Sequence, residues 1–226
     1  MRIRLRIIIV FLLVLSFLFT ACEKKRGKVD PNLSLRSAAM QGDAAWVQKA
    51  LKEGADVNSQ DSDNGSTALI SATFRGYTSI VKILLEKGAD VNIKSKVGLT
   101  ALVFAVGNRN VEIVQLLLDK GAELNVKDTT DLYGRTLLMR AISTGNVKIV
   151  QALLDKGADV NERSNNGDTA LIKAAEEGYS GVVKLLLERG ANTSARNDDG
   201  YTALKWAKER SRTQIAQMLK EAGALE

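Results

Sequence analysis

Apolar and polar positions along this 226-residue chain follow a pattern whose period is about 33 residues. One phrase, Gly-Ala followed by Asp, Glu or Asn, begins at Gly54, Gly88, Gly121, Gly157 and Gly190, with a degenerate copy at Gly223. A second phrase, Gly-x-Thr followed by two apolar residues, begins at Gly65, Gly98, Gly134, Gly167 and Gly200. The two phrases keep a nearly constant phase, so the chain is an array of similar units.

Each unit contains two short segments in which apolar residues recur with helical spacing. In the fifth unit these segments are 169–175 and 182–188, and the turn between them contains Gly178. Glycine suits the left-handed residue that ends a helix, here and at Gly76 and Gly145. Threonine, a favoured N-cap, stands where each first helix would begin, at Thr67, Thr100, Thr136, Thr169 and Thr202. The sequence therefore predicts a stack of helical hairpins.

These units strongly resemble ankyrin repeats, whose signature is Thr-Pro-Leu-His-x-Ala and whose second helix leads into Gly-Ala-Asp-Val-Asn. Residues 88–92 and 157–161 match the second phrase in full. The resemblance spans residues 33–226 and implies an all-α solenoid of stacked helix-turn-helix units with β-hairpin fingers. The expected units are 33–63, 64–96, 97–131, 132–165, 166–198 and 199–226.

The units depart from the ankyrin signature at its proline and its histidine. The proline position holds alanine in four units and leucine in one, and the histidine position holds Ile70, Val103, Met139, Ile172 and Lys205. The family's threonine–histidine hydrogen bonds are therefore missing, and we expect stacking alone to supply ordinary stability. Arg109 and Ser211 replace a turn glycine, at a cost of about 1 kcal/mol each where φ is positive. Lys220 replaces a leucine of the last unit and indicates a polar end cap.

The first thirty residues have the composition of an export signal. Arg2, Arg4 and Arg6 precede or begin an apolar run over residues 7–19 that only Ser16 interrupts. A permanent membrane-spanning helix needs about twenty apolar residues, so this run is short for one. We therefore expect the segment to be cleaved.

Residues 19–22, Phe-Thr-Ala-Cys, resemble the lipobox of bacterial lipoproteins, in which the cysteine becomes the acylated first residue. The resemblance implies removal of residues 1–21 and an acylated Cys22 that begins a basic tether over 22–32. Phe19 departs from the Leu, Val or Ile usual at its place, and the alternative is a chance cysteine at the end of an ordinary signal or anchor. The expected location is the periplasmic side of the bacterial envelope, and Glu23, where some inner-membrane lipoproteins carry aspartate, favours the outer membrane.

The composition narrows the chemistry that the chain can perform. It has no histidine and one cysteine, which excludes Ser-His-Asp and Cys-His nucleophile systems and Cys/His zinc sites. A phosphate-binding glycine motif is absent, and residues 61–65 place their glycine one residue too early for a calcium loop. Without the three leader arginines the net charge is 29 − 26 = +3, which is too small to indicate nucleic-acid binding. We expect no enzyme activity, no cofactor and no metal.

Ankyrin arrays bind through their concave face and finger tips, where the units of this chain also differ most. The resemblance implies that a protein partner contacts Phe74, Arg75, Val97, Leu99, Leu132, Tyr133, Arg135, Asp168, Glu176, Glu177 and Tyr201. This surface is aromatic and basic in its N-terminal half and acidic in its C-terminal half. Interface energy concentrates on aromatic and arginine anchors, so we expect Phe74, Tyr133, Arg135 and Tyr201 to dominate. Trp206 fits packing in the end cap equally well.

The sequence thus predicts a monomeric, non-catalytic protein-binding module, anchored by a lipid in the cell envelope. The partner is expected to be an envelope enzyme that the module stabilises or a toxin that it neutralises. An alternative is a structural envelope protein that contacts peptidoglycan or associates with itself.

Overall fold

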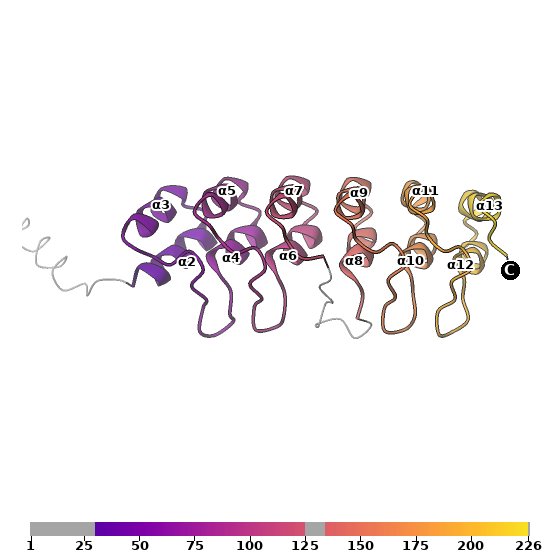
Figure 1. Ribbon diagram of the computed structural model, residues 1–226, viewed down its shortest axis with the longest axis horizontal. Coiled ribbons are helices and arrows are strands. Elements are labelled where there is room, and N and C mark those ends of the chain that lie inside the picture. The colour runs from indigo at the N-terminus through magenta and orange to yellow at the C-terminus, as the bar shows by residue number, and fades with distance from the viewer. Residues whose placement is uncertain (1–29, 125–133, 226) are drawn as a thin grey trace, which may run out of the picture.

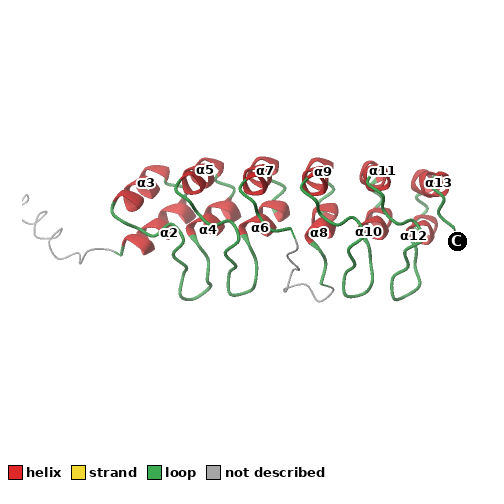
Figure 2. Cartoon of the chain, viewed as in Figure 1, coloured by secondary structure: helices red, strands yellow, loops and turns green. Residues whose placement is uncertain are grey.

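The computed structural model describes residues 30–124 and 134–225. These residues form twelve helices and, within the same ranges, no strand (Figure 2). In consecutive pairs the helices are α2 (Pro31–Gln41) and α3 (Ala44–Lys52), α4 (Ala68–Arg75) and α5 (Thr78–Glu86), α6 (Ala101–Gly107) and α7 (Val111–Asp119), α8 (Leu137–Ser143) and α9 (Val147–Asp155), α10 (Ala170–Glu177) and α11 (Ser180–Glu188), α12 (Ala203–Glu209) and α13 (Thr213–Glu221). The expected all-α array of hairpins is confirmed.

The hairpins stack side by side into one elongated array (Figure 1). The first helices of the hairpins form one row, the second helices form another, and loops project beyond the row of first helices. Extensive contacts join only helices of one hairpin or of adjacent hairpins. Each unit therefore depends for its stability on its immediate neighbours.

The first helices begin at the threonines that the sequence singles out. The threonine side chain accepts a hydrogen bond from the backbone N–H three residues later at Thr67, Thr136, Thr169 and Thr202, over 3.1–3.3 Å. Thr100 has the same extended backbone but makes no such bond. Its Oγ1 is buried and has no hydrogen-bond partner among the described residues.

The turns between paired helices contain a residue with positive φ, as predicted. Gly76 and Gly178 adopt φ of 76° and 86°, and the backbone N–H of each bonds back into the helix that it ends. Arg109 and Ser211 take the same conformation, with φ of 58° and 54°, although they carry side chains. The prediction that these two residues take the left-handed conformation of a turn glycine is therefore confirmed.

Apolar side chains at the signature histidine position pack between adjacent units. Ile70, Val103, Met139 and Ile172 are all buried. Lys205 occupies this position in the last unit and is exposed, because the described chain places no further unit beyond it. Stacking thus replaces the family's hydrogen bonds in the interior of the array.

The fingers differ from the expected β-hairpins, since no strand occurs in the part of them that the structure describes. Four fingers are each closed by one backbone bond across their base. The bonds run from the N–H groups of Asp61, Ser95, Ser164 and Asn197 to the carbonyls of Ser66, Leu99, Asp168 and Tyr201. Adjacent fingers also share single bonds, such as Lys96 N–H to the Asn64 carbonyl at 2.9 Å. Isolated bonds of this kind do not make a ladder, so the fingers are turns rather than β-ribbons.

The asparagine that ends Gly-Ala-Asp-Val-Asn joins its unit to the next one at three places. Asn58 Oδ1 accepts a bond from Asp90 N–H, and Asn92 Oδ1 accepts one from Glu123 N–H, both at 2.8 Å. Asn161 Oδ1 repeats the contact two units later, again at 2.8 Å. These bonds fix the register between neighbouring units.

No helix among residues 30–124 and 134–225 is both long and apolar enough to cross a membrane. The predicted signal segment, Cys22 and most of the predicted tether lie outside the described residues.

Candidate functional site

The predicted partner-binding residues that the structure describes belong to one side of the array. This side, here termed the finger surface, consists of the first helices α2, α4, α6, α8, α10 and α12 and of the described parts of the loops 59–67, 93–100, 134–136, 162–169 and 195–202 (Figure 1). Two of the predicted residues, Leu132 and Tyr133, lie outside the described residues.

Exposed apolar side chains gather on the N-terminal half of the finger surface. Phe74 is 49 % exposed and Val97 is 53 % exposed, in agreement with their predicted places on the surface. Leu33 and Met40 on α2 are also exposed, at 49 % and 38 %. Large exposed apolar groups of this kind mark interaction surfaces when they are contiguous.

Phe74 contacts its neighbour Arg75 on α4 and two residues of the next unit, Phe104 and Asn108. Its ring meets the edge of the Phe104 ring, with centroids 5.6 Å apart and planes at 83°. The Arg75 guanidinium lies 5.8 Å from the Phe74 ring centroid, and its Nε donates to Met40 Sδ at 3.1 Å. Asn108 Nδ2 donates to the Phe74 carbonyl at 2.7 Å. The exposed ring is therefore preorganised for contact.

Charged side chains dominate the C-terminal half, but they bind one another. Lys173 Nζ lies 2.8 Å from Glu177 Oε1 and 2.9 Å from Glu176 Oε2. Burial of Lys173 lowers its pKa, but the hydrogen bonds to Glu177 and Glu176 outweigh this effect and leave the pKa raised. Arg210 adds a further ion pair to Glu176 at 3.7 Å. Glu176 and Glu177, predicted as contact residues, are thus already paired within the chain.

Tyr201 takes part in an aromatic and cationic cluster at the end of the array. Its ring centroid lies 4.7 Å from that of Trp206, and Lys205 Nζ lies 3.8 Å from the Tyr201 centroid. The hydrogen bond and charge of Glu209 raise the pKa of the Tyr201 hydroxyl, with smaller contributions from burial and Asp199. Trp206 is half-buried against Tyr201, which fits its alternative role in packing the cap.

The predicted exposure of Leu99 is not found in the structure. Leu99 is only 7 % exposed and belongs to the apolar core, so its placement on the accessible surface is wrong. The residue before the capping threonine turns inward at the base of this finger.

Asp168 accepts hydrogen bonds from the side-chain amides of Asn166 and Asn197, each at 2.8 Å, and so joins two fingers. Arg135 is half-buried and interacts with other residues.

The sequence reasoning missed Leu33, Met40 and Phe104 on this surface. Met40 stands 34 residues before Phe74, so an alignment of units would have placed it beside that residue. Phe104 stands one period after Ser71, so the alignment places it on the same face of the next first helix. The repeat pattern thus contained the signal for Met40 and Phe104.

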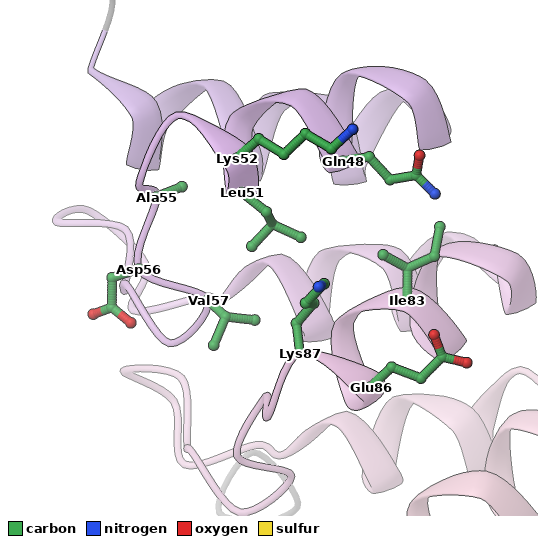
Figure 3. A pocket seen from close by; sticks show the side chains of 9 residues that line it. All are labelled: Gln48, Leu51, Lys52, Ala55, Asp56, Val57, Ile83, Glu86 and Lys87. Carbon is green, nitrogen blue, oxygen red and sulfur yellow. The ribbon is translucent and has the colours of Figure 1, made fainter.

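A hollow lies away from this surface, between α3 and α5 (Figure 3). It has a volume of about 570 Å³ and apolar walls from Leu51, Val57 and Ile83. Lys52 and Glu86 place charges of opposite sign at its margin (Figure 3). The apolar walls stand at positions where the repeat pattern predicts ordinary core, so the sequence carried no signal for this hollow.

The described acidic residues are expected to bind no metal, and their arrangement can be compared with that of a metal site. Within residues 30–124 and 134–225, no three His, Cys, Asp or Glu side chains gather closely enough to hold a metal ion. Asp61, at the start of the calcium-like segment, accepts bonds from Asn64 and Asp63 N–H at 3.1 and 3.0 Å. These bonds, with the charges of Arg36 and Lys96, keep its pKa below the ordinary value. Its carboxylate therefore stabilises a turn.

A family model described as ankyrin repeats (3 copies) matches residues 35–128, 97–164 and 138–225. The chain is also similar to solved structures. An ankyrin repeat domain from Acinetobacter baumannii is 33 % identical with a TM-score of 0.78, over 84 % of this chain and 98 % of that chain. A chain in the complex of a predatory endopeptidase from Bdellovibrio bacteriovorus with an immunity protein is 35 % identical with a TM-score of 0.74, over 83 % of this chain and 97 % of that chain.

Curated relatives match over shorter segments. The ankyrin repeat and SAM domain-containing protein 6 of Rattus norvegicus is 47 % identical over 64 residues, which are 28 % of this chain and 7 % of that protein. Ankyrin repeat domain-containing protein 40 of Homo sapiens is 45 % identical over 64 residues, 28 % of this chain and 17 % of that protein. The chain thus spans less than a fifth of the length of these relatives.

Proposed function

The chain belongs to the ankyrin repeat family, and from this premise we propose that it is a non-catalytic module that binds a protein partner through the finger surface. The observation that carries the proposal is the group of exposed apolar side chains around Phe74. A soluble array gains nothing by exposing aromatic rings on one side, whereas a protein interface concentrates its energy on such anchors. The finger surface extends over several units and is large enough for an interface of about 800 Å² on each partner.

The kind of partner that we propose is an envelope enzyme or toxin that the module restrains. The support is the similarity, over nearly the whole of both chains, to a chain from the complex of an endopeptidase with an immunity protein. The absence of histidine and the single cysteine agree with a role that depends on shape and charge rather than on catalysis. The module would act by occupying a surface that its partner needs for activity.

We further propose that Cys22 carries a lipid that holds the module to the outside of the inner membrane or to the outer membrane. The support is the order of features in residues 1–22: three arginines, an apolar run, two small residues and the cysteine. Each acyl methylene that enters the bilayer adds about 0.8 kcal/mol of membrane affinity, so several chains together give stable anchoring.

Crosslinking in intact cells tests the binding function. A photoreactive side chain at position 74 of the full chain should join one protein reproducibly, whereas the same group at position 148 on the opposite side should not. Crosslinks to peptidoglycan or to a second copy of the chain alone would contradict the proposed function and favour a structural role.

Labelling with radioactive palmitate tests the anchor separately. The wild-type chain should take up label and sediment with membranes, and the Cys22→Ala variant should lose the label. Failure of the wild-type chain to take up label would overturn the proposed lipid anchor without affecting the binding function.

A further inference from the structure

We propose that the N-terminal half of the finger surface binds an acidic segment of the partner, which inserts a tyrosine side chain into a hollow between α2 and the first finger. This inference rests on the proposed binding function and specifies the chemistry of the partner. It is carried by the shape of the hollow, by the residues at its margin and by the charges around it.

Small residues of the first two units help to line the hollow. It has a volume of about 230 Å³ and lies among residues of α2, α4 and the first finger. Ser37 and Ser71 line it, at the position where the third unit has Phe104 and the last unit has Trp206. The third and last units thus carry an aromatic ring where the first two units carry a small hydroxyl.

The lining of the hollow combines an exposed apolar margin with polar groups. Leu33 and Met40 lie on the apolar margin and are exposed. Ser37, Ser71 and Asn64 supply hydroxyl and amide groups. A tyrosine fits this arrangement because its ring can pack against the apolar margin while its hydroxyl takes a hydrogen bond.

Exposed cations of the neighbouring units outnumber the exposed carboxylate of the first finger. The cations are Arg75 on α4, Lys96 on the second finger and Arg109 in the turn after α6, and the carboxylate is Asp63. The acidic Asp61 is paired with Arg36 at 3.7 Å and with backbone N–H groups of its own turn. Carboxylates next to the inserted tyrosine would therefore meet cations, which gives specificity and speeds association.

The C-terminal half of the finger surface offers a poorer site for the same segment. Its central lysine, Lys173, is already bound by Glu176 and Glu177. The Tyr201 and Trp206 rings contact each other with their planes tilted by 38°, and Lys205 and Arg210 lie over the faces of Tyr201 and Trp206. An incoming side chain would have to break these contacts before it could bind.

Selection from a phage library of random twelve-residue peptides against the full chain tests the inference. We expect enriched peptides to contain tyrosine flanked by Asp or Glu. Their affinity, measured by fluorescence anisotropy, should fall with added salt, because exposed ion pairs are screened.

Three variants locate the binding site of the enriched peptides. Ser37→Phe fills the hollow with the residue type that the third unit carries at the same position, and it should weaken binding at least tenfold. Phe74→Ala should weaken binding about tenfold, and Arg75→Glu should do the same by repelling carboxylates. Val147→Ala and Lys148→Glu, at exposed positions on α9, are matched controls that should leave the affinity unchanged. Thermal unfolding followed by circular dichroism verifies that each variant is folded.

Several outcomes would overturn the inference. They are enrichment of basic peptides or of peptides without tyrosine, no enrichment at all, and unchanged binding to a folded Ser37→Phe variant. If the enriched peptides respond to Tyr201→Ala instead, the inference fails and the binding function stands. If the crosslinking experiment at position 74 also finds no protein, both fail.

Discussion

Arg109 and Ser211 end their helices in a conformation that glycine adopts at the same place in other units. Their φ values of 58° and 54° lie in the left-handed region, where a side chain crowds the following carbonyl oxygen. The fold requires this conformation because the second helix must turn back along the first. The strain at these two residues is therefore imposed by the hairpin.

We expect Arg109→Gly to raise the free energy of unfolding by about 0.5–1 kcal/mol. Relief of about 1–2 kcal/mol of backbone strain outweighs the larger entropy that glycine gives the unfolded chain. The reverse change, Gly76→Ala, should lower stability by about 1–2 kcal/mol, since the nearest atom to the new Cβ is Asn110 Nδ2 at 3.9 Å and no clash adds to the strain. Urea unfolding measures both changes, and a less stable Arg109→Gly variant would contradict the explanation.

The ion pairs of Lys173 should make the free energy of unfolding fall as the pH becomes alkaline. Its pKa is raised in the folded chain above the ordinary value of 10.5, because bonds to Glu177 and Glu176 outweigh the effect of burial. A raised pKa means that its stabilising effect is complete at lower pH and is lost as pH rises past 10.5 and through the raised pKa. Chemical unfolding between pH 9 and 12 should therefore show a smaller loss of stability for Lys173→Gln than for wild type.

A matched variant separates this effect from general alkaline unfolding. Lys82→Gln removes a lysine whose ion pair with Glu112 is exposed, and exposed pairs contribute only about 0–1 kcal/mol. Its pH profile should follow that of the wild type. Equal slopes for the Lys173→Gln variant and the wild type would show that the interpretation of the Lys173 site is wrong.

At the scale of the helical hairpin, the sequence predicts starts and stops more reliably than it predicts contacts between units. Threonine caps and turn glycines act through bonds within a few residues, so Thr67 and Gly76 could be assigned from the pattern alone. The bond from Asp90 N–H to Asn58 depends on how two units stack, and no local pattern specifies that geometry.

In the candidate site too, the sequence predicts features that depend on nearby residues better than features that depend on how the units stack. Phe74 could be placed on the surface from its position in the helix, and it is exposed. Leu99 could not be separated from the exposed finger residues, because its burial depends on how the base of the finger packs on the core. The pairing of Glu176 and Glu177 with Lys173 follows from helical spacing of three and four residues, which the sequence does contain.

The caps of the first helices provide a prediction at this scale. Thr67→Ala should lower the free energy of unfolding by about 1 kcal/mol, because the Ile70 N–H loses its side-chain acceptor. Thr100→Ala should cost less, since Thr100 Oγ1 makes no cap bond and is buried without a hydrogen-bond partner among the described residues. Equal losses in urea unfolding would contradict the difference between the two caps.

On the scale of the whole array, the last unit presents charges where interior units present apolar groups. Ile172 and Ala175 are buried beneath the last unit. One period later, the corresponding residues are Lys205 and Lys208, and both are exposed. Their charges keep the end of the array from accepting a further unit, in the manner of the capping units of repeat proteins.

Replacing both lysines should therefore make the arrays associate. The combined variant Lys205→Ile and Lys208→Ala restores the interior pattern of Ile172 and Ala175 at the exposed end. Sedimentation velocity should show a larger species that grows with protein concentration, because a new apolar patch seeks burial. Lys184→Ala, on the outer helix α11, is the control and should sediment like the wild type.

Among the described residues, extensive helix contacts reach only from one unit to the next. A pulling force applied at the N-terminal end would be opposed first by the contacts of α2 and α3 with α4 and α5, and only afterwards by those of the next pair. The chain would then lengthen in steps as single units peel away, while the remaining units keep their shape. Because the proposed hollow lies beside α2, a load at this end would disrupt the proposed binding site before it reaches the later units.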